Sequence, residues 1–483
     1  MTDPHPPAPS NRPVVLAIGL LLVVYAVGIG QGWVALPGGH VRADGVPHLA
    51  AIGPFALLLA AIAILPLVPA AAHWWESNLH KLLLAGGLAL ATLGYLAWGH
   101  PDASGQLAWT TLVHTLWGDF VPFIVLLFAL FVISGGIRIE GDLAAHPLTN
   151  AGFLAAGAVL ASLIGTTGAA MVLIRPLLET NRERKHVAHT VVVFIFVACN
   201  CGGLLLPLGD PPLFLGYLKG VNFLWTLSLW KSWLLVNGLL IAAYVVWDRL
   251  WFYPHEAARD IARDEARIHP LRFAGIKLNG TLLVGVILAV ALLDPGKAVP
   301  GTSWQPWPYL REAVQLALVA VSLAAGAPRV RQANRFHYGP IVEVACLFVG
   351  IFICMQPALE ILRANGAALG IDTPAKFFWA SGSLSSVLDN APTYLVFFET
   401  ASSLSGGQVS PAGVPVAEPL LAGVSLGAVL MGAMTYIGNG PNFMVKTIAE
   451  TSGVRMPSFF GYLWYSCLLL LPILALNVWL FVK

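Results

Sequence analysis

Long apolar runs recur along this chain and restrict the environment in which it can fold. Runs of about 18 to 25 apolar residues are long enough for an α-helix to cross roughly 30 Å of hydrocarbon. Hydrophobic residues make up 57% of the 483 residues and charged residues only 10%, whereas soluble domains carry about 25% charged residues. The runs predict an all-α polytopic membrane protein in a lipid bilayer, with about eleven transmembrane helices at residues 14–32, 48–70, 80–98, 119–137, 187–225, 232–248, 277–294, 310–327, 339–362, 417–437 and 460–481.

Two further apolar stretches, residues 150–178 and 375–403, carry Gly, Thr, Asp or Pro at their centres. We interpret each as a re-entrant helical hairpin whose tip lies inside the membrane, although hydropathy alone also allows a single span with a polar kink. The charges favour hairpins, because only two re-entrant segments bring the basic groups to one face, at residues 175–185, 249–277 and 329–335 and at Lys81, Arg138, Lys446 and Arg455.

This basic face predicts the orientation of the chain. Lys and Arg favour the cytoplasmic side of a membrane, so we expect a cytoplasmic N-terminus, a C-terminus outside and a bacterial-type inner (plasma) membrane. Asp3 and several prolines precede the first run, and no small-residue cleavage site follows it. We therefore expect a retained helix rather than a signal peptide.

Gly, Pro and polar residues interrupt two of the spanning stretches, at residues 200–212 and 435–442. Lipid cannot satisfy loose backbone N–H and C=O groups, so such a break survives only where it lines a cavity or binds something. The breaks occupy corresponding places in two units, each of which consists of a span, a hairpin, a break and a final span. An odd number of membrane crossings separates the two units. The order predicts an inverted repeat, with N-terminal scaffold helices in residues 1–117, a first repeat in 118–248, a cytoplasmic loop and linking helices in 249–337, and a second repeat in 338–483.

A matched pair of breaks is typical of the substrate site of a secondary transporter. A membrane-embedded carboxylate costs about 2.5 to 3.5 kcal/mol on insertion scales, so Asp389 and Asp210 must face a polar cavity. Hard oxygen ligands suit a hard cation, and we expect Asp389, Asn390 and Asp210 to bind Na⁺. The full set of expected ion- or substrate-binding residues lies at the hairpin tips and the breaks: Thr166, Thr167, Asn200, Gly209, Asp210, Asp389, Asn390, Thr393, Gly438, Asn439 and Asn442.

The pairing of these residues follows from the repeat. We expect the second tip, at Asp389, to face the break at 438–442, and Thr166 and Thr167 of the first tip to face Asn200 and Asp210. The alternative for the two threonines is close helix packing.

Other charged residues have weaker assignments. Glu399 lies in the return arm of the second hairpin, and the sequence leaves open whether its side chain faces the cavity. Asp119 and Glu360 are expected at the membrane interface. We expect Arg175 to extend to the cytoplasmic face rather than to clamp a substrate.

The residues also carry a family resemblance. Ser386-Val-Leu-Asp-Asn-Ala-Pro-Thr393, and Asn200-x-Gly-Gly followed by Pro-Leu-Gly-Asp-Pro-Pro212, resemble the paired signatures of the ion transporter superfamily, which includes D-type sodium/proton antiporters and citrate-transporter-like proteins. The resemblance covers residues 119–483 and implies an eleven-span inverted-repeat fold, usually a homodimer, with an elevator-like movement. The first tip reads Leu163-Ile-Gly-Thr-Thr-Gly168, where antiporter-like members repeat Leu-Asp-Asn-x-Thr-Thr, so the chain resembles the citrate-transporter-like branch.

Two functions remain open at this point. The first hypothesis is a sodium/proton antiporter in which Asp389 and Asp210 exchange Na⁺ for H⁺. The alternative is a sodium- or proton-coupled citrate or dicarboxylate symporter. An enzyme is not expected, because no nucleophile elbow, His-rich metal motif or phosphate loop appears, and neither a cofactor nor nucleic acid is expected. The five cysteines lie in apolar segments, where we interpret them as small buried hydrophobes.

Overall fold

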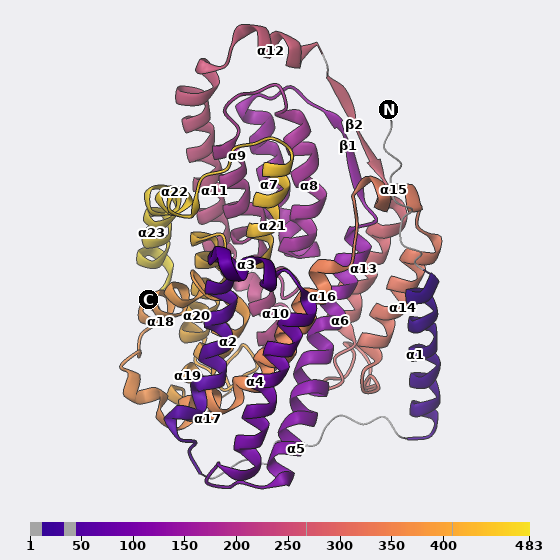
Figure 1. Cartoon of the computed structure of the whole chain (residues 1–483), viewed down its shortest axis with the longest axis vertical. Helices are drawn as coiled ribbons and strands as arrows, with labels where there is room; N and C mark the ends of the chain where they lie inside the picture. The colour runs from indigo at the N-terminus through magenta and orange to yellow at the C-terminus, as the bar shows by residue number, and fades with distance from the viewer. Residues whose placement is uncertain (1–11, 33–44, 267, 408) are drawn as a thin grey trace.

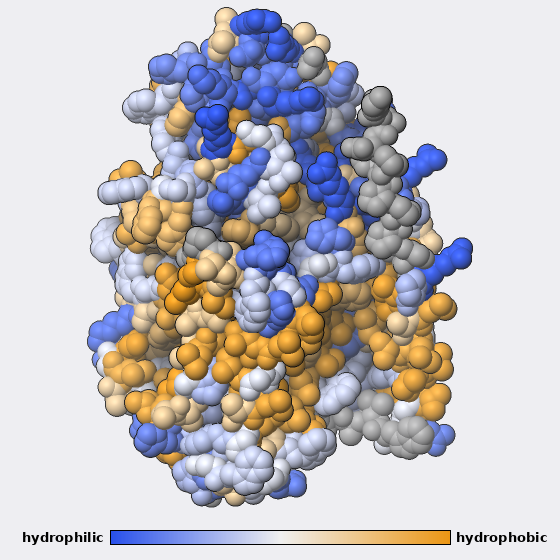
Figure 2. All heavy atoms as spheres, viewed as in Figure 1, coloured by the Kyte–Doolittle hydropathy of each residue, from blue (hydrophilic) through white to orange (hydrophobic). Residues whose placement is uncertain are grey.

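Helices account for nearly all of the regular structure in this chain. The computed structural model describes residues 12–32, 45–266, 268–407 and 409–483, and in these parts one two-stranded ribbon accompanies the helices (Figure 1). Figure 2 shows apolar residues gathered in a band across the molecule, with hydrophilic residues at the end that carries α12 (Ala258–Glu265). The predicted all-α polytopic membrane protein is confirmed.

Six helices of the described residues are long and apolar enough to cross a membrane, and a bent pair adds a seventh. The six are Arg12–Gly30, Asn78–Trp98, Gly105–Ser134, Pro147–Ile164, Trp225–His255 and Phe459–Phe481. The bent pair is α16 (Gly339–Cys354) and α17 (Gln356–Asn365), which meet at 42°. These helices include α1 (Arg12–Gly30), α4 (Asn78–Trp98), α5 (Gly105–Val113), α6 (Val121–Ser134), α11 (Trp230–Trp247), α22 (Phe459–Tyr465) and α23 (Leu471–Phe481).

The other predicted spans correspond to shorter helices. They are α2 (Gly53–Ile64), α9 (Ala188–Ala198), α13 (Ile276–Leu292), α14 (Leu310–Ala325) and α20 (Glu418–Met431). The helices α9 and α20 are short because each ends where a predicted break begins. Short connecting helices complete the chain: α3 (Pro69–Trp75), α10 (Pro211–Leu218), α15 (Pro328–Ala333) and α21 (Gly440–Thr451).

Each predicted hairpin is a pair of helices around a short break. The first pair is α7 (Pro147–Ile164) and α8 (Thr166–Thr180), which lie side by side and are separated only by Gly165 (Figure 1). Gly165 has φ +79°, a conformation that glycine adopts without steric penalty. The second pair is α18 (Pro374–Ser385) and α19 (Asn390–Leu404). Glycines at 423 and 427 bring α20 so close to α18 that an added Cβ would meet the backbone of Pro374 or Phe378.

Two local features differ from the expectation from sequence. The span expected to start near residue 119 is part of a longer helix that begins at Gly105. Residues His114–Phe120 of this longer helix form a π-helical turn. The strands β1 (Arg138–Asp142) and β2 (His269–Ala274) pair antiparallel in a region expected to contain only loops and helices. Both strands are short and mixed in polarity, which explains why the apolar pattern did not indicate them.

Candidate ion and substrate site at the hairpin tips

Both hairpin tips converge on one carboxylate, that of Asp210. Thr166, the first residue of α8, donates a hydrogen bond of 3.0 Å to Asp210 Oδ1. Asn390, the first residue of α19, donates one of 2.6 Å to Asp210 Oδ2. Asn439, in the second break, donates a third of 3.0 Å to Oδ1. Asp210 is 1% exposed, so its carboxyl group is solvated by these three neutral donors rather than by bulk water.

Asparagine side chains also link the two breaks to each other. Asn200 Nδ2 donates to Asn442 Oδ1 at 2.7 Å, and Asn439 Nδ2 donates to the Cys199 carbonyl at 3.0 Å. Asn442 Nδ2 in turn donates to the carbonyls of Gly432 and Thr435, each at 2.9 Å. The carbonyls left open by the helix breaks are therefore partly satisfied by side-chain amides, as an interruption inside a membrane requires.

The tips and breaks need glycine where backbones approach. A Cβ on Gly209 would collide with the Gly203 carbonyl, and a Cβ on Gly438 would collide with the Gly432 carbonyl. The first tip is fastened to its break by a backbone hydrogen bond of 2.9 Å from the Thr166 N–H to the Gly209 carbonyl. At the second tip, the Thr435 hydroxyl donates to the Ser386 carbonyl. The glycine-to-carbonyl contact inside each break is therefore of the same type in both halves, whereas the hydrogen bond between break and tip uses backbone atoms in the first half and a threonine hydroxyl in the second.

Asp389 and Thr393 lie apart from this hydrogen-bond network. Asp389 is the N-cap of α19, where its Oδ1 accepts from the Ala391 N–H at 3.1 Å, and it lines a cavity. The Thr393 hydroxyl donates back to the Asp389 carbonyl at 3.0 Å. Thr167 also lines the cavity, whereas its neighbour Thr166 is turned to Asp210. Asp389, Asn390 and Asp210 are thus near neighbours in the fold, but only the last two are hydrogen-bonded.

Cation ligands here would be mainly neutral oxygens. In the described ranges, no three His, Cys, Asp or Glu side chains are grouped so that they could hold a metal ion. One oxygen is available beside Asp210: Asn390 Oδ1 is buried and has no hydrogen-bond partner. Amide, hydroxyl and carbonyl oxygens together with one carboxylate are suitable ligands for a hard cation.

A cavity of about 2350 Å³ runs from the tips to a charged end of the molecule. Its inner residues include Ser134, Thr167, Asp389 and Asn439. Its other lining residues include most of the basic side chains that the sequence analysis assigned to one face: Lys81, Arg138, Arg175, Arg182, Arg184, Lys185, Arg335, Lys446 and Arg455. From the sequence, these basic residues indicated only the re-entrant hairpins and the orientation of the chain in the membrane, and nine of them line this cavity.

Two ion pairs that sequence reasoning missed join the hairpin and break elements to the long helices. Lys219, just after α10, lies 2.9 Å from Asp119, and Arg363 of α17 lies 2.7 Å from Glu399 of α19. Asp119, which we expected at the membrane interface, is 4% exposed. None of these four residues lines the large cavity. The only signals of these ion pairs in the sequence were a lysine and an arginine next to apolar helices. Their acidic partners were missed because they lie at distant positions in the chain.

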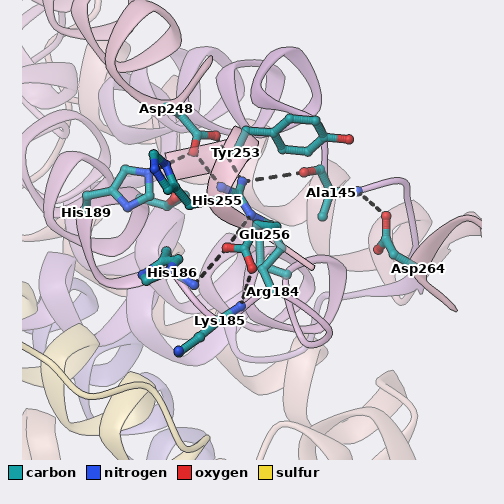
Figure 3. A network of polar contacts seen from close by, with 12 residues as sticks. Ala145, Arg184, Lys185, His186, His189, Asp248, Tyr253, His255, Glu256 and Asp264 are labelled. Carbon is teal, nitrogen blue, oxygen red and sulfur yellow. Dashed lines mark hydrogen bonds and ion pairs between the residues drawn. The ribbon is translucent and has the colours of Figure 1, made fainter. Parts of the chain in front are cut away.

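A second buried polar cluster, shown in Figure 3, holds the segment between α8 and α9. Arg184 makes two hydrogen bonds to Asp248, and His189 lies 3.0 Å from the same carboxylate. Glu256 accepts from the backbone N–H groups of Lys185 and His186 at 2.8 Å each. A buried pair with this many partners fixes the connection between the hairpin and α9.

Broken helices at an inward-directed polar site, inside a protein with several membrane-spanning helices, define a membrane transporter. The chain belongs to the family described as "Putative citrate transport", whose model matches residues 44–482. A search of curated proteins found no match.

Proposed function

We propose that this protein is a secondary transporter that couples the movement of a di- or tricarboxylate such as citrate to Na⁺ or H⁺. The observation that carries the proposal is the charge of the cavity that leads to the tips. Among the described residues its lining includes nine Lys or Arg side chains and six Asp or Glu side chains. A cleft with an excess of one charge concentrates ligands of the opposite charge.

The tip residues suit both partners of such a reaction. Asp210 and Asn390 Oδ1 offer oxygens to a cation, and Asp389 at the cavity wall offers a second carboxylate that can bind Na⁺ or a proton. The N-termini of α8 and α21 are exposed to the same cavity through Thr167 and Gly440, and unpaired N–H groups at helix N-termini favour anions. A cation bound at Asp210 would lower the electrostatic penalty for an organic anion bound nearby.

Alternating access is part of the proposal. The similar glycine contacts of the two breaks support an inverted repeat, and the ion pairs Lys219–Asp119 and Arg363–Glu399 support a barrier on the side away from the cavity. In an elevator-type movement these pairs would separate as the hairpins shift against the long helices. A homodimer, a cytoplasmic N-terminus and a bacterial-type inner membrane complete the proposal.

A sodium/proton antiporter is the second candidate, and one observation favours it. Asp210 and Asp389 are both carboxylates at helix breaks, so Na⁺ and H⁺ could compete for them without any organic anion. In that case Na⁺ affinity rises with pH and citrate has no effect.

Sodium binding distinguishes the candidates. Purified protein is titrated with ²²Na⁺ between pH 5.5 and 8.5, with and without citrate, and proteoliposomes are tested for uptake of labelled citrate. We expect citrate to tighten Na⁺ binding and Na⁺ to tighten citrate binding by the same factor, because thermodynamic coupling is reciprocal. Sodium binding that depends on pH but not on citrate, together with no citrate uptake, would establish the antiporter instead.

A further inference from the structure

Most of the basic side chains around the cavity are already neutralised by acids. The ion pairs are Lys81–Glu343, Arg138–Glu140, Arg182–Glu179, Arg184–Asp248 and Lys446–Glu450. Within the described part of the chain, four of the lining Lys and Arg residues form no ion pair with an acid: Arg175, Lys185, Arg335 and Arg455. Of these, Arg175 and Arg335 lie at one short segment of backbone. These two guanidinium groups therefore contribute charge that the protein itself does not balance.

Arg175 and Arg335 are brought together by one short segment of backbone. Arg175 Nη2 donates to the Asn334 carbonyl at 2.7 Å, and Arg138 Nη1 donates to the adjacent Ala333 carbonyl at 2.6 Å. Arg335 follows directly, and the charges of Arg138 and Arg335 both act on that of Arg175. Because Arg138 is paired with Glu140, the repulsion that remains unbalanced is mainly that between Arg175 and Arg335, and an anion placed between them would relieve it.

The backbone at Arg335 is itself unusual. Its φ of +48° is left-handed, although it is not a glycine, and such a conformation costs about 1 to 3 kcal/mol when it is held in place. The Arg335 side chain is exposed along the cavity wall. The strained residue therefore keeps a charged side chain available at the cavity rather than packed against neighbouring helices.

We propose that Arg175 and Arg335, supported by Arg138, form an anion-binding site in the cavity that receives a di- or tricarboxylate before it reaches the hairpin tips. The inference rests on the proposed carboxylate transport and adds a second, outer site to it. Arg175 lies eight residues beyond Thr167 on α8, which places it roughly 12 Å along the helix from the tip at 1.5 Å per residue. Guanidinium groups bind carboxylates through paired N–H donors.

The outer site is expected to select by ligand charge. A monocarboxylate can engage one guanidinium group, whereas a dicarboxylate or a tricarboxylate can engage both. The site therefore increases the capture of polycarboxylates at low concentration and has little influence on the turnover of a carboxylate that has already reached the tips.

The test measures uptake of labelled citrate by proteoliposomes of neutral phosphatidylcholine, for Arg175→Gln, Arg335→Gln and the double variant. We expect KM to rise about fivefold to tenfold in each single variant and further in the double variant, with kcat within about twofold of wild type; tenfold corresponds to about 1.4 kcal/mol. Arg175→Lys should recover only part of the affinity, because it keeps the charge but loses the paired N–H donors of the guanidinium group. Arg182→Gln is the matched control, since Arg182 lines the same cavity but pairs with Glu179.

Several results would overturn the outer site. One is an unchanged KM in the double variant when wild type transports citrate. Another is a KM increase of equal size for a monocarboxylate, which would mean that charge selection is absent. An effect that appears only when the vesicles contain anionic lipid would assign the arginines to lipid headgroups. Failure of wild type to bind or transport any carboxylate would refute the proposed function itself.

Discussion

Asn390 and Asp210 are 180 positions apart in the chain, yet the Asn390 amide donates a hydrogen bond of 2.6 Å to the Asp210 carboxylate. The contact joins the tip of the second hairpin to the break of the first half. The second tip and the first break are therefore in direct contact at this carboxylate. The two halves act on one shared carboxylate, and the predictions below test how that carboxylate and its surroundings work.

The first prediction separates the two acids at the tips. Asp389→Asn should remain folded, because Asn replaces Asp as an N-cap with little loss, but coupled transport should fall at least about tenfold, or about 1.4 kcal/mol. Asp210→Asn should lose transport and also stability, because its new amide group would face the amide donors of Asn390 and Asn439. Thermal unfolding in detergent and citrate uptake measure the two effects. Full coupled uptake in Asp389→Asn would remove that residue from the ion site.

The second prediction concerns the glycines of the breaks. Gly209→Ala and Gly438→Ala should each reduce transport strongly, because the added methyl group would collide with the Gly203 or Gly432 carbonyl. Gly238→Ala in α11 is the matched control, since nothing lies within 4 Å of a Cβ added there and the residue is outside the cavity lining. Uptake is normalised to the amount of folded protein. Wild-type uptake in both break variants would indicate ordinary loops.

The third prediction tests the ion pair Arg363–Glu399. Glu399→Gln leaves Arg363 without its acid, so the barrier on that side should open more often. A Cys introduced at buried Thr400 should then react severalfold faster with a membrane-impermeant thiol reagent, whereas the exchanged pair Arg363→Glu with Glu399→Arg should react at close to the wild-type rate. Lys376→Gln, which removes an exposed pair with Asp372, serves as the control. Equal reactivity of the Thr400 reporter in Glu399→Gln and wild type would show that this pair is no barrier.

The fourth prediction concerns topology. If both hairpins are re-entrant, a Cys at Arg182 should be labelled only from the cytoplasm and a Cys at Val409 only from outside. Both positions are well exposed, with 67% of the Arg182 side chain and 70% of Val409 accessible. Spheroplasts and inverted vesicles provide the two sides. Labelling of both positions from the same side would mean that the second hairpin crosses the membrane, and labelling of Arg182 from outside with Val409 from the cytoplasm would mean that the first one does.

The fifth prediction concerns pH. Burial and the nearby carboxylates of Glu183 and Asp264 raise the pKa of Asp142, on β1, to about 6. A carboxyl group whose folded pKa is above its unfolded value binds more protons when folded, so stability decreases as pH rises from about 4 to about 6. Asp142→Asn should therefore unfold at a higher temperature than wild type above pH 6, with the difference shrinking at lower pH.

The control for this pH effect is a carboxyl group whose pKa is shifted in the opposite direction. A hydrogen bond from Lys376 lowers the pKa of Asp372, so ionised Asp372 is stabilising at neutral pH, and Asp372→Asn should not gain stability there. Both variants are compared with wild type by thermal unfolding between pH 4.5 and 7.5. A difference between Asp142→Asn and wild type that does not change with pH would show that the Asp142 carboxyl does not cause the effect.

The sequence predicted the helices, the two hairpins and the polar residues at their tips, because apolar length and the position of Gly, Pro and Asp are local properties. It did not predict which polar residues meet. Asn200, which we expected to face Thr166, hydrogen-bonds to Asn442 of the other half, a partner that the sequence did not indicate. Pairs such as Lys219 with Asp119 depend on how distant helices pack, and no periodicity in the chain encodes that packing. The ribbon of β1 and β2 was missed for the same reason, since the residues that pair in it are separated by 127 or more positions along the chain.

The first hairpin tip has Thr166 and Thr167 where the second tip has Asp389 and Asn390, and Asp210 accepts hydrogen bonds from both tips. Each elementary charge carried across a membrane potential of 100 mV changes the energy by about 2.3 kcal/mol. A carrier with fewer fixed negative charges at its moving tips has less work done on it by the resting potential when it returns empty. In the proposed transport cycle, the fixed negative charges at the tips and breaks are the carboxylates of Asp210 and Asp389, so these two groups carry the contribution of this region to voltage sensitivity.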